Sequence, residues 1–190
     1  MQIRFPKVSV IIPVWNPGDG IRRCVTSLRG QTLKDIEMIF VDDYGTDGAM
    51  DVVRAAAAEE PRIRIITNAE NMGAGASRNA AIDVARGEYL SFVDADDYVS
   101  LNFLEMLYTK AKSEDLDIVK GRIVYELEDG TETAHADLNE RIRNGIRDGK
   151  PLFRLFTHQH QSAIYRRFLL EKYDIRYGTS RRAQDDTFLL

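Results

Sequence analysis

Three carboxylates within four residues follow an apolar stretch near the middle of the chain. Residues 89–93 are rich in strand-forming side chains, and Asp94, Asp96 and Asp97 come directly after them. Ligands of open parallel sheets bind beyond the carboxyl ends of the strands, so these carboxylates should lie at the rim of a cleft. Crowded carboxylates repel one another unless a cation neutralises them, and Mg²⁺ or Mn²⁺ prefers oxygen ligands shared with substrate phosphates. The spacing predicts a metal-assisted phosphate site; the alternative is an acidic turn in which Asp96 or Asp97 caps the next helix.

Two earlier apolar runs end in a similar way. One run, at residues 8–14, is rich in β-branched side chains and is followed by Trp15. The other, at residues 36–41, is mostly apolar and is followed by the pair Asp42 and Asp43. A third strand is expected over residues 62–66, and a segment with helical spacing follows each of the three strands. The second of these helices is alanine-rich and should cover about 49–59, and a loop of small residues at 71–77 should lead into the third. This alternation is typical of βαβ units on a parallel sheet. We therefore expect Trp15, both aspartates and the later carboxylates to meet at one edge of the sheet.

The second half of the chain has a weaker pattern. We expect a helix over 101–113 and a strand over 116–119, which 122–125 continue towards a hairpin at 128–131. Residues 132–150 are polar and interrupted by glycine and asparagine, which predicts a loop over the cleft. A short strand and a short helix should follow at 162–165 and 167–173. A helical pattern begins near 181 and stops with the sequence, so we expect the chain to be a piece of a longer protein.

Composition limits the classes of protein. The 190 residues, 44% hydrophobic and 29% charged, suit one globular domain. A net charge of -4 argues against nucleic acid as a partner, because binding to phosphate backbones needs a basic patch. The sequence has no apolar run that spans a bilayer and no signal-peptide core, so we expect a cytoplasmic protein. The single cysteine, Cys24, is expected in the core.

An aromatic ring, several carboxylates and a metal together suit a nucleoside diphosphate. The ring stacks on the base, a carboxylate accepts a hydrogen bond, and the metal neutralises the phosphates. The sequence contains no P-loop motif, and Gly73-Ala74-Gly75 lacks the third glycine of the dinucleotide fingerprint, since Arg78 stands in its place. The pattern therefore favours a mononucleotide over a dinucleotide.

Four motifs in this order make the chain resemble the family 2 glycosyltransferases, inverting enzymes that use nucleotide-sugar donors. The motifs are VSVIIPVWN at 8–16, QT at 31–32 with VDD at 41–43 and TDG at 46–48, N-x-G at 71–73 with SRN at 77–79, and GEY at 87–89 with DADD at 94–97. The resemblance covers nearly the whole chain. It implies the GT-A fold, an α/β architecture with a Rossmann-like, mostly parallel sheet flanked by helices and a small antiparallel and helical acceptor-side portion. It also implies one domain over 1–190, with a nucleotide-binding half at 1–100 and an acceptor-side half at 101–190.

The resemblance implies roles for the residues that match these motifs. Pro13 and Trp15 would form the wall on which the base, uracil, stacks. Asp43 would hydrogen-bond the base edge, and Arg78 would contact the base or a phosphate. The family usually has Gly-Ser after the paired aspartates, where this chain has Tyr44-Gly45. We therefore expect the ribose-side loop to have a different shape.

The remaining roles concern the metal and the proton. Asp94-Ala95-Asp96 matches the family's Asp-x-Asp motif, which implies that Asp96 binds Mn²⁺ or Mg²⁺ directly while Asp94 lies near the ribose or a metal-bound water. The family's general base stands in a Glu-Asp-x-x-Phe motif. Gln184-Asp185-Asp186-Thr187-Phe188 occupies that place here, so Asp185 is the candidate base.

The reaction implied is a single displacement with inversion, from a UDP-sugar to the hydroxyl of a saccharide or lipid-linked acceptor. Bacterial surface polysaccharide or lipopolysaccharide synthesis is the expected setting, and peripheral association with the inner face of the membrane stays open. One alternative is a sugar-nucleotidyltransferase, although residues 14–18 lack the glycine-rich loop and basic residue that such enzymes favour. The other is a catalytically silent nucleotide-binding module.

Overall fold

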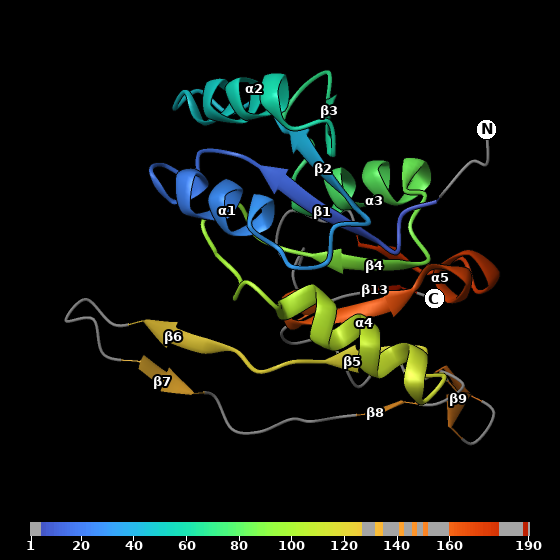
Figure 1. Ribbon diagram of the computed structural model, residues 1–190. Helices are drawn as coiled ribbons and strands as arrows, with labels where there is room; N and C mark the ends of the chain where they lie inside the picture. The colour runs from blue at the N-terminus through green and yellow to red at the C-terminus, as the bar shows by residue number, and fades with distance from the viewer. Residues whose placement is uncertain are drawn as a thin grey trace.

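A sheet of seven strands in the order β3-β2-β1-β4-β11-β5-β8 runs through the molecule (Figure 1). The structure is a computed structural model and describes residues 5–126, 132–134, 141–142, 146–147, 150–151, 160–178 and 188–189. Four neighbouring strands are parallel, namely β1 (Val8–Val14), β2 (Ile36–Asp42), β3 (Ile63–Thr67) and β4 (Tyr89–Phe92). The chain builds β1, β2 and β3 in one direction and then places β4 on the other side of β1. The strand order therefore reverses between β1 and β4, and such reversal points are where open α/β sheets bind ligands.

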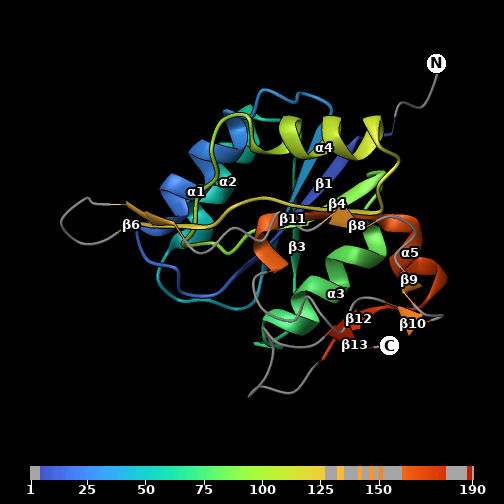
Figure 2. The ribbon, with the colours of Figure 1, turned by 90° about the horizontal axis from the view of Figure 1, so that it is seen from below.

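Helices cover both faces of the sheet because the strands are apolar on both faces. One face packs against α1 (Gly20–Arg29), α2 (Ala49–Glu59) and α4 (Phe103–Ser113), and the other packs against α3 (Ala74–Val84) and α5 (Arg167–Lys172) (Figure 2). Along β1, Val10 and Ile12 enter the first core, whereas Ile11 enters the second. Every residue of β1 and β2 is buried, which explains why both strands are mostly apolar, with Ser9, Glu37 and Asp42 as the polar exceptions. Cys24 is buried in the first core, as expected.

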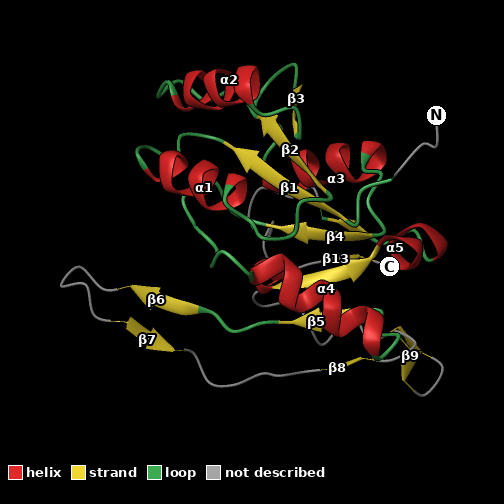
Figure 3. Ribbon diagram, in the orientation of Figure 1, coloured by secondary structure: helices red, strands yellow, loops and turns green. Residues whose placement is uncertain are grey.

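The second half of the chain extends the sheet with antiparallel strands (Figure 3). These strands are β5 (Ile118–Lys120), β8 (Arg141–Ile142) and β11 (Ala163–Arg166), and the turn η2 (His160–Ser162) leads into β11. Three separate two-stranded pairs are β6 (Val124–Glu126) with β7 (Glu132–Ala134), β9 (Ile146–Arg147) with β10 (Lys150–Pro151), and β12 (Arg176–Tyr177) with β13 (Phe188–Leu189). The β6–β7 pair confirms the expected hairpin, whose turn lies outside the described residues.

The sequence expectation for 132–150 was wrong in part. We expected a loop, but this segment contains β7, β8 and β9, and β8 pairs with the edge strand β5. A short edge strand needs only backbone hydrogen bonds to a neighbour, so it leaves little apolar pattern in the sequence. Within the described part of the chain, no helix has the length and apolar character needed to cross a bilayer.

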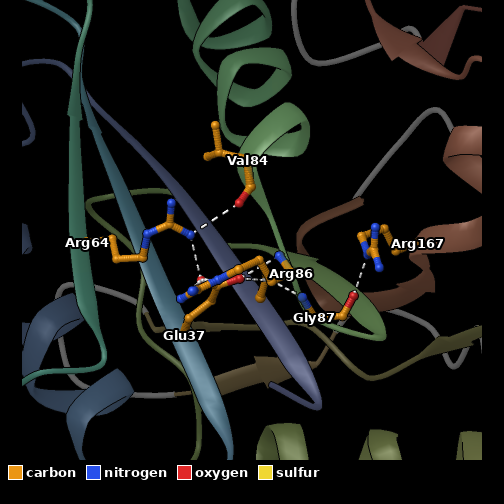
Figure 4. A network of polar contacts seen from close by, with 7 residues as sticks. Glu37, Arg64, Val84, Arg86, Gly87 and Arg167 are labelled. Atoms are coloured by element: carbon orange, nitrogen blue, oxygen red, sulfur yellow. Dashed lines mark hydrogen bonds and ion pairs between the residues drawn. The ribbon is translucent and has the colours of Figure 1, made fainter. Parts of the chain in front are cut away.

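At the amino ends of the parallel strands, the buried carboxylate of Glu37 on β2 connects neighbouring strands (Figure 4). Glu37 Oε1 accepts hydrogen bonds from Ser9 Oγ at 2.6 Å and from the Arg86 backbone nitrogen at 2.7 Å, and Oε2 accepts from Arg64 Nη1 at 2.7 Å. The Gly87 nitrogen donates to Ser9 Oγ at 2.8 Å. A Cβ on Gly87 would lie 2.4 Å from the Ser9 nitrogen, so only glycine fits there. The network ties β1, β2, β3 and the segment before β4 together.

The Glu37 network predicts that the free energy of unfolding depends measurably on pH in the acid range. Burial favours a raised pKa for Glu37, but the hydrogen bonds from Ser9, Arg86 and Arg64 outweigh it, so the pKa is lowered. A lowered folded-state pKa gives stability that is present above the unfolded value of about 4.3 and is lost as the pH falls through the folded value. We expect Glu37→Gln to lower the free energy of unfolding at pH 7 by about 2 kcal/mol and to flatten its decline below about pH 4.5. Urea unfolding of both proteins from pH 3 to 7 measures this; parallel pH curves would contradict it.

Candidate active site

A cleft of about 770 Å³ lies beyond the carboxyl ends of β1, β2 and β4. Twelve residues line it: Pro13, Trp15, Asn16, Pro17, Asp43, Asn71, Gly73, Ala74, Arg78, Asp94, Ala95 and Asp96. The three strand ends therefore meet at one edge of the sheet, as the βαβ pattern predicts. Seven of the lining residues are the nucleotide-site candidates of the sequence, so the fold brings all of those candidates together. Asp185, the candidate base, lies outside the described residues.

Trp15 forms an exposed wall of the cleft at the end of β1. The preceding strand is buried throughout, yet the Trp15 side chain is 57% exposed. The next residue, Asn16, has a φ of 49° and accepts a hydrogen bond from the Thr46 backbone nitrogen through Oδ1 at 2.7 Å. This bond ties the loop after β1 to the loop after β2. An apolar ring held open on a fixed loop can stack on a planar ligand.

Asp43 follows β2 and fixes the far wall of the cleft. Its carboxylate is buried and accepts hydrogen bonds from Asn68 Nδ2 and the Met72 nitrogen on Oδ1, and from the Gly73 nitrogen on Oδ2, each at 2.8 Å. A carboxylate has about four acceptor sites, so these three bonds leave room for about one more donor. Asp43 therefore shapes the segment 68–73 as well as lining the cleft. Its expected hydrogen bond to a base edge stays a prediction.

Asn68 is a site residue that the sequence analysis missed. Besides Asp43, its amide nitrogen also contacts Ser77 Oγ at 2.9 Å, and its backbone nitrogen donates to the Asp42 carbonyl at 3.0 Å. It therefore joins the ends of β2 and β3 to the first turns of α3. The sequence signal that could have identified it is its position, because Asn68 is a polar residue two positions after the expected strand at 62–66.

Arg78 on α3 forms a buried ion pair with Asp94 at the end of β4. Arg78 Nη2 lies 2.7 Å from Asp94 Oδ1, and the two side chains are 2% and 28% exposed. The guanidinium also lies over the ring of Tyr177, at 5.1 Å from the ring centroid. Asp94 Oδ2 accepts a second hydrogen bond, from Gln161 Nε2 at 2.9 Å. Both oxygens of Asp94 are thus engaged, and the role of Arg78 in ligand contact stays a prediction.

Asp96 presents the exposed carboxylate of the cleft. Among the described residues it makes no side-chain hydrogen bond or ion pair, whereas Asp94 makes both. Its backbone packs against the start of α1, because a Cβ on Gly20 would lie 2.8 Å from Asp96 Cα. Partial burial, together with the charges of Asp94 and Asp96, raises the pKa of Asp97 to about 6. Neither Asp96 nor Asp97 caps a helix, since α4 begins at Phe103, so the acidic-turn alternative in that form is wrong.

The carboxylates offer a partial ligand set for a divalent cation. Their oxygens are the hard donors that Mg²⁺ and Mn²⁺ prefer. In the ranges that the structure describes, however, no three His, Cys, Asp or Glu side chains are grouped closely enough to hold a metal. A divalent cation at this cleft would therefore have to take most of its ligands from the phosphates of a bound ligand and from water.

The loop after Asp43 has a left-handed backbone at its first residue, although that residue is a tyrosine. Tyr44 has a φ of 67°, and its side chain is 61% exposed. The Tyr44 nitrogen donates to Asp42 Oδ1 at 3.2 Å, which helps to hold this turn. Tyrosine therefore adopts a conformation here that favours glycine, and the expected difference in the shape of the ribose-side loop stays a prediction.

The positive φ strains the backbone at Tyr44. We therefore expect the Tyr44→Gly variant to be as stable as the wild type, or more stable by up to about 1 kcal/mol. The left-handed conformation costs a tyrosine about 1–2 kcal/mol, and the extra chain entropy of glycine offsets part of the gain. Thr46→Gly is the matched control, because Thr46 has no positive φ and should lose about 0.5–1 kcal/mol. Urea unfolding compares the three proteins. Equal losses in both variants would contradict strain at Tyr44.

The chain belongs to glycosyltransferase family 2, because the model of that family, Glycosyl transferase family 2, matches residues 9–174. Among curated proteins, it is 34% identical over 186 residues to the uncharacterized glycosyltransferase YibD of Escherichia coli (strain K12). That match covers 94% of this chain and 54% of YibD, so the chain spans about half the length of this relative.

Solved structures show the same fold. S. aureus TarS 1-349 in complex with UDP superimposes with a TM-score of 0.77 at 24% identity, over 94% of this chain and 52% of that one. The mannosyltransferase PcManGT of Pyrobaculum calidifontis, in complex with GDP-Man and Mn²⁺, gives a TM-score of 0.69 at 21% identity, over 96% and 50% of the two chains. The expected GT-A architecture is therefore confirmed.

Proposed function

We propose that the protein is an inverting glycosyltransferase that moves a sugar from a nucleoside diphosphate donor, a UDP-sugar, to an acceptor hydroxyl. The observation that carries the proposal is the convergence of an exposed ring, a buried carboxylate and an exposed carboxylate in one cleft, at the switch point of the sheet. Family membership supports the class of reaction. The fold is shared with TarS, which is solved with UDP and also with UDP-GlcNAc, and this supports the donor.

Each wall of the cleft suits one part of such a donor. The Trp15 ring and Pro13 would stack on the base, and the remaining acceptor site of Asp43 would take a base N–H. Arg78 would contact the base or a phosphate and stabilise the charge that builds on the departing diphosphate. Asp185 would take the proton of the acceptor hydroxyl, a contribution of about 10²–10⁴-fold. The acceptor-side half would then begin after residue 100, and we propose a saccharide or lipid-linked acceptor from bacterial polysaccharide synthesis.

A divalent cation, Mn²⁺ or Mg²⁺, completes the proposal. Asp96 would bind it directly, and Asp94 would contact the ribose or a water on the cation. When bound, such an ion neutralises the charge that develops on a leaving diphosphate. Mn²⁺ in the complex of PcManGT, which shares the fold, supports this choice.

Calorimetry and a turnover assay test the proposal together. We expect UDP to bind only weakly without Mn²⁺ and much more tightly with it, and we expect UDP release from a UDP-sugar when an acceptor is present. A GDP-sugar serves as the competing donor. Metal-dependent binding without turnover would favour the silent module, whereas diphosphate release from a nucleoside triphosphate and a sugar phosphate would favour the nucleotidyltransferase. Absence of nucleotide binding with either metal would refute the site.

A further inference from the structure

The carboxylate of Asp94 is held from both sides. Arg78 Nη2 donates to Oδ1 at 2.7 Å, and Gln161 Nε2 donates to Oδ2 at 2.9 Å. A single donor leaves a carboxylate able to rotate about its last side-chain bond, because that torsion is broad. A second donor on the other oxygen fixes the rotation. Gln161 therefore determines which way the Asp94 carboxylate faces.

Gln161 can fix Asp94 because the backbone on its carboxyl side is tied to the sheet. It lies in the turn η2 directly before β11. The Gly121 nitrogen donates to the Ser162 carbonyl at 2.6 Å, and Ser91 Oγ donates to the Ala163 carbonyl at 3.2 Å. Ser91 belongs to β4, the strand that ends before Asp94. The glutamine thus connects the second half of the chain to the strand end that carries the cleft carboxylates.

The side-chain amide of Gln161 is uncharged, and this affects the electrostatic field of the cleft. Arg78 and Asp94 balance each other, so the exposed carboxylate of Asp96 keeps a negative field at the cleft. A cationic donor in place of Gln161 would weaken that field and compete with a divalent ion. An amide supplies the hydrogen bond without adding charge. Gln161 is not among the residues that line the cleft, so it acts through Asp94.

We propose that Gln161 is a positioning residue of the donor site, which fixes the orientation of the Asp94 carboxylate towards the cleft. The contact between Gln161 and Asp94 follows from the hydrogen-bond geometry and does not depend on the proposed function. Its effect on donor binding rests on the proposed function.

An exchange of donor and acceptor tests the contact without any ligand. Gln161→Glu places a carboxylate against Asp94 Oδ2 and removes the donor, so we expect the unfolding midpoint to fall by roughly 3–8 °C. The double variant Asp94→Asn with Gln161→Glu has the same net charge as the wild type and can form the same hydrogen bond in the reverse direction. We expect it to be clearly more stable than the sum of the two single changes predicts. Additive losses would overturn the contact.

Thr109→Glu is the control for added charge. Thr109 is exposed on α4 and is not among the cleft-lining residues, so its variant should shift the midpoint by less than about 2 °C. A shift equal to that of Gln161→Glu would mean that charge alone, and not the lost hydrogen bond, destabilises the protein.

Calorimetry with UDP and Mn²⁺ then tests the positioning role. We expect Gln161→Ala to bind UDP about 10-fold more weakly, by analogy with the 10- to 100-fold cost of losing outer-shell partners of metal sites, and Thr109→Glu to bind as the wild type does. Equal UDP affinity in Gln161→Ala and the wild type would overturn the role. If the exchange variants show coupling but the wild type binds no nucleotide, the proposed function fails, and Gln161 remains assigned to Asp94.

Discussion

Asp96→Asn is expected to lower the rate of metal-dependent sugar transfer by about 10²–10³-fold. This factor corresponds to the loss of a few kcal/mol of charge stabilisation in the transition state. The reason is the unequal environment of the cleft carboxylates. Asp94 is neutralised by Arg78 and held by Gln161, whereas Asp96 is exposed and makes no hydrogen bond or ion pair with the described residues. Asp96 is therefore the carboxylate that is free to bind a cation. Initial rates of UDP release over a Mn²⁺ titration measure the loss.

Asp97→Asn is the adjacent comparison. Asp97 does not line the cleft, and its pKa of about 6 indicates that its negative charge is already unfavourable. Its replacement should cost at least tenfold less transfer than Asp96→Asn. Circular dichroism and the unfolding midpoint of both variants confirm that neither loss reflects unfolding. A larger loss in Asp97→Asn would move the metal ligand from Asp96 to Asp97.

Arg78→Met is expected to lower the free energy of unfolding by about 3 kcal/mol, the lower end of the range for breaking a buried ion pair. The Arg78 side chain is 2% exposed, and its removal leaves the Asp94 charge with Gln161 as its remaining side-chain partner among the described residues. The lower end applies because Asp94 is 28% exposed and keeps some hydration. The unfolding midpoint should fall by roughly 6–12 °C. Metal-dependent UDP binding should be lost as well.

Two companion variants separate charge from geometry at this position. Arg78→Lys keeps the charge but not the planar fork, so it should recover part of the stability and little of the nucleotide affinity. The double variant Arg78→Met with Asp94→Leu removes both charges and should be more stable than Arg78→Met alone. A double variant that is less stable than Arg78→Met would show that the ion pair is not the source of the loss.

The parallel part of the fold could be predicted from the sequence because its strands are buried on both faces. β1 and β2 are mostly apolar, and α2 begins and ends where the alanine-rich segment predicts. α3 begins at Ala74, inside the small-residue segment that we expected to be a loop. A glycine with a φ of 86°, Gly73, precedes it and lets the chain turn into the helix. Local composition alone does not place such a start.

The second half was harder to predict because its strands are short and antiparallel. β8 joins the sheet by pairing with β5, and β11 inserts between β4 and β5 although it lies far from β4 in the sequence. Strands of two to four residues carry too few side chains for a periodic signal. Their position depends on which sheet edge is available, and only the assembled sheet provides that edge.

The sequence by itself determined where the site lies, because apolar strands that end in Trp15, Asp43 and Asp94 must bring those residues to one sheet edge. Only the tertiary structure decided which groups these side chains contact. Asp94 pairs with Arg78 on α3 and with Gln161, 67 positions further along the chain, and Asp43 holds the nitrogens of Met72 and Gly73. Strand ends follow from local composition, whereas hydrogen-bond partners distant in sequence follow from strand register and helix packing.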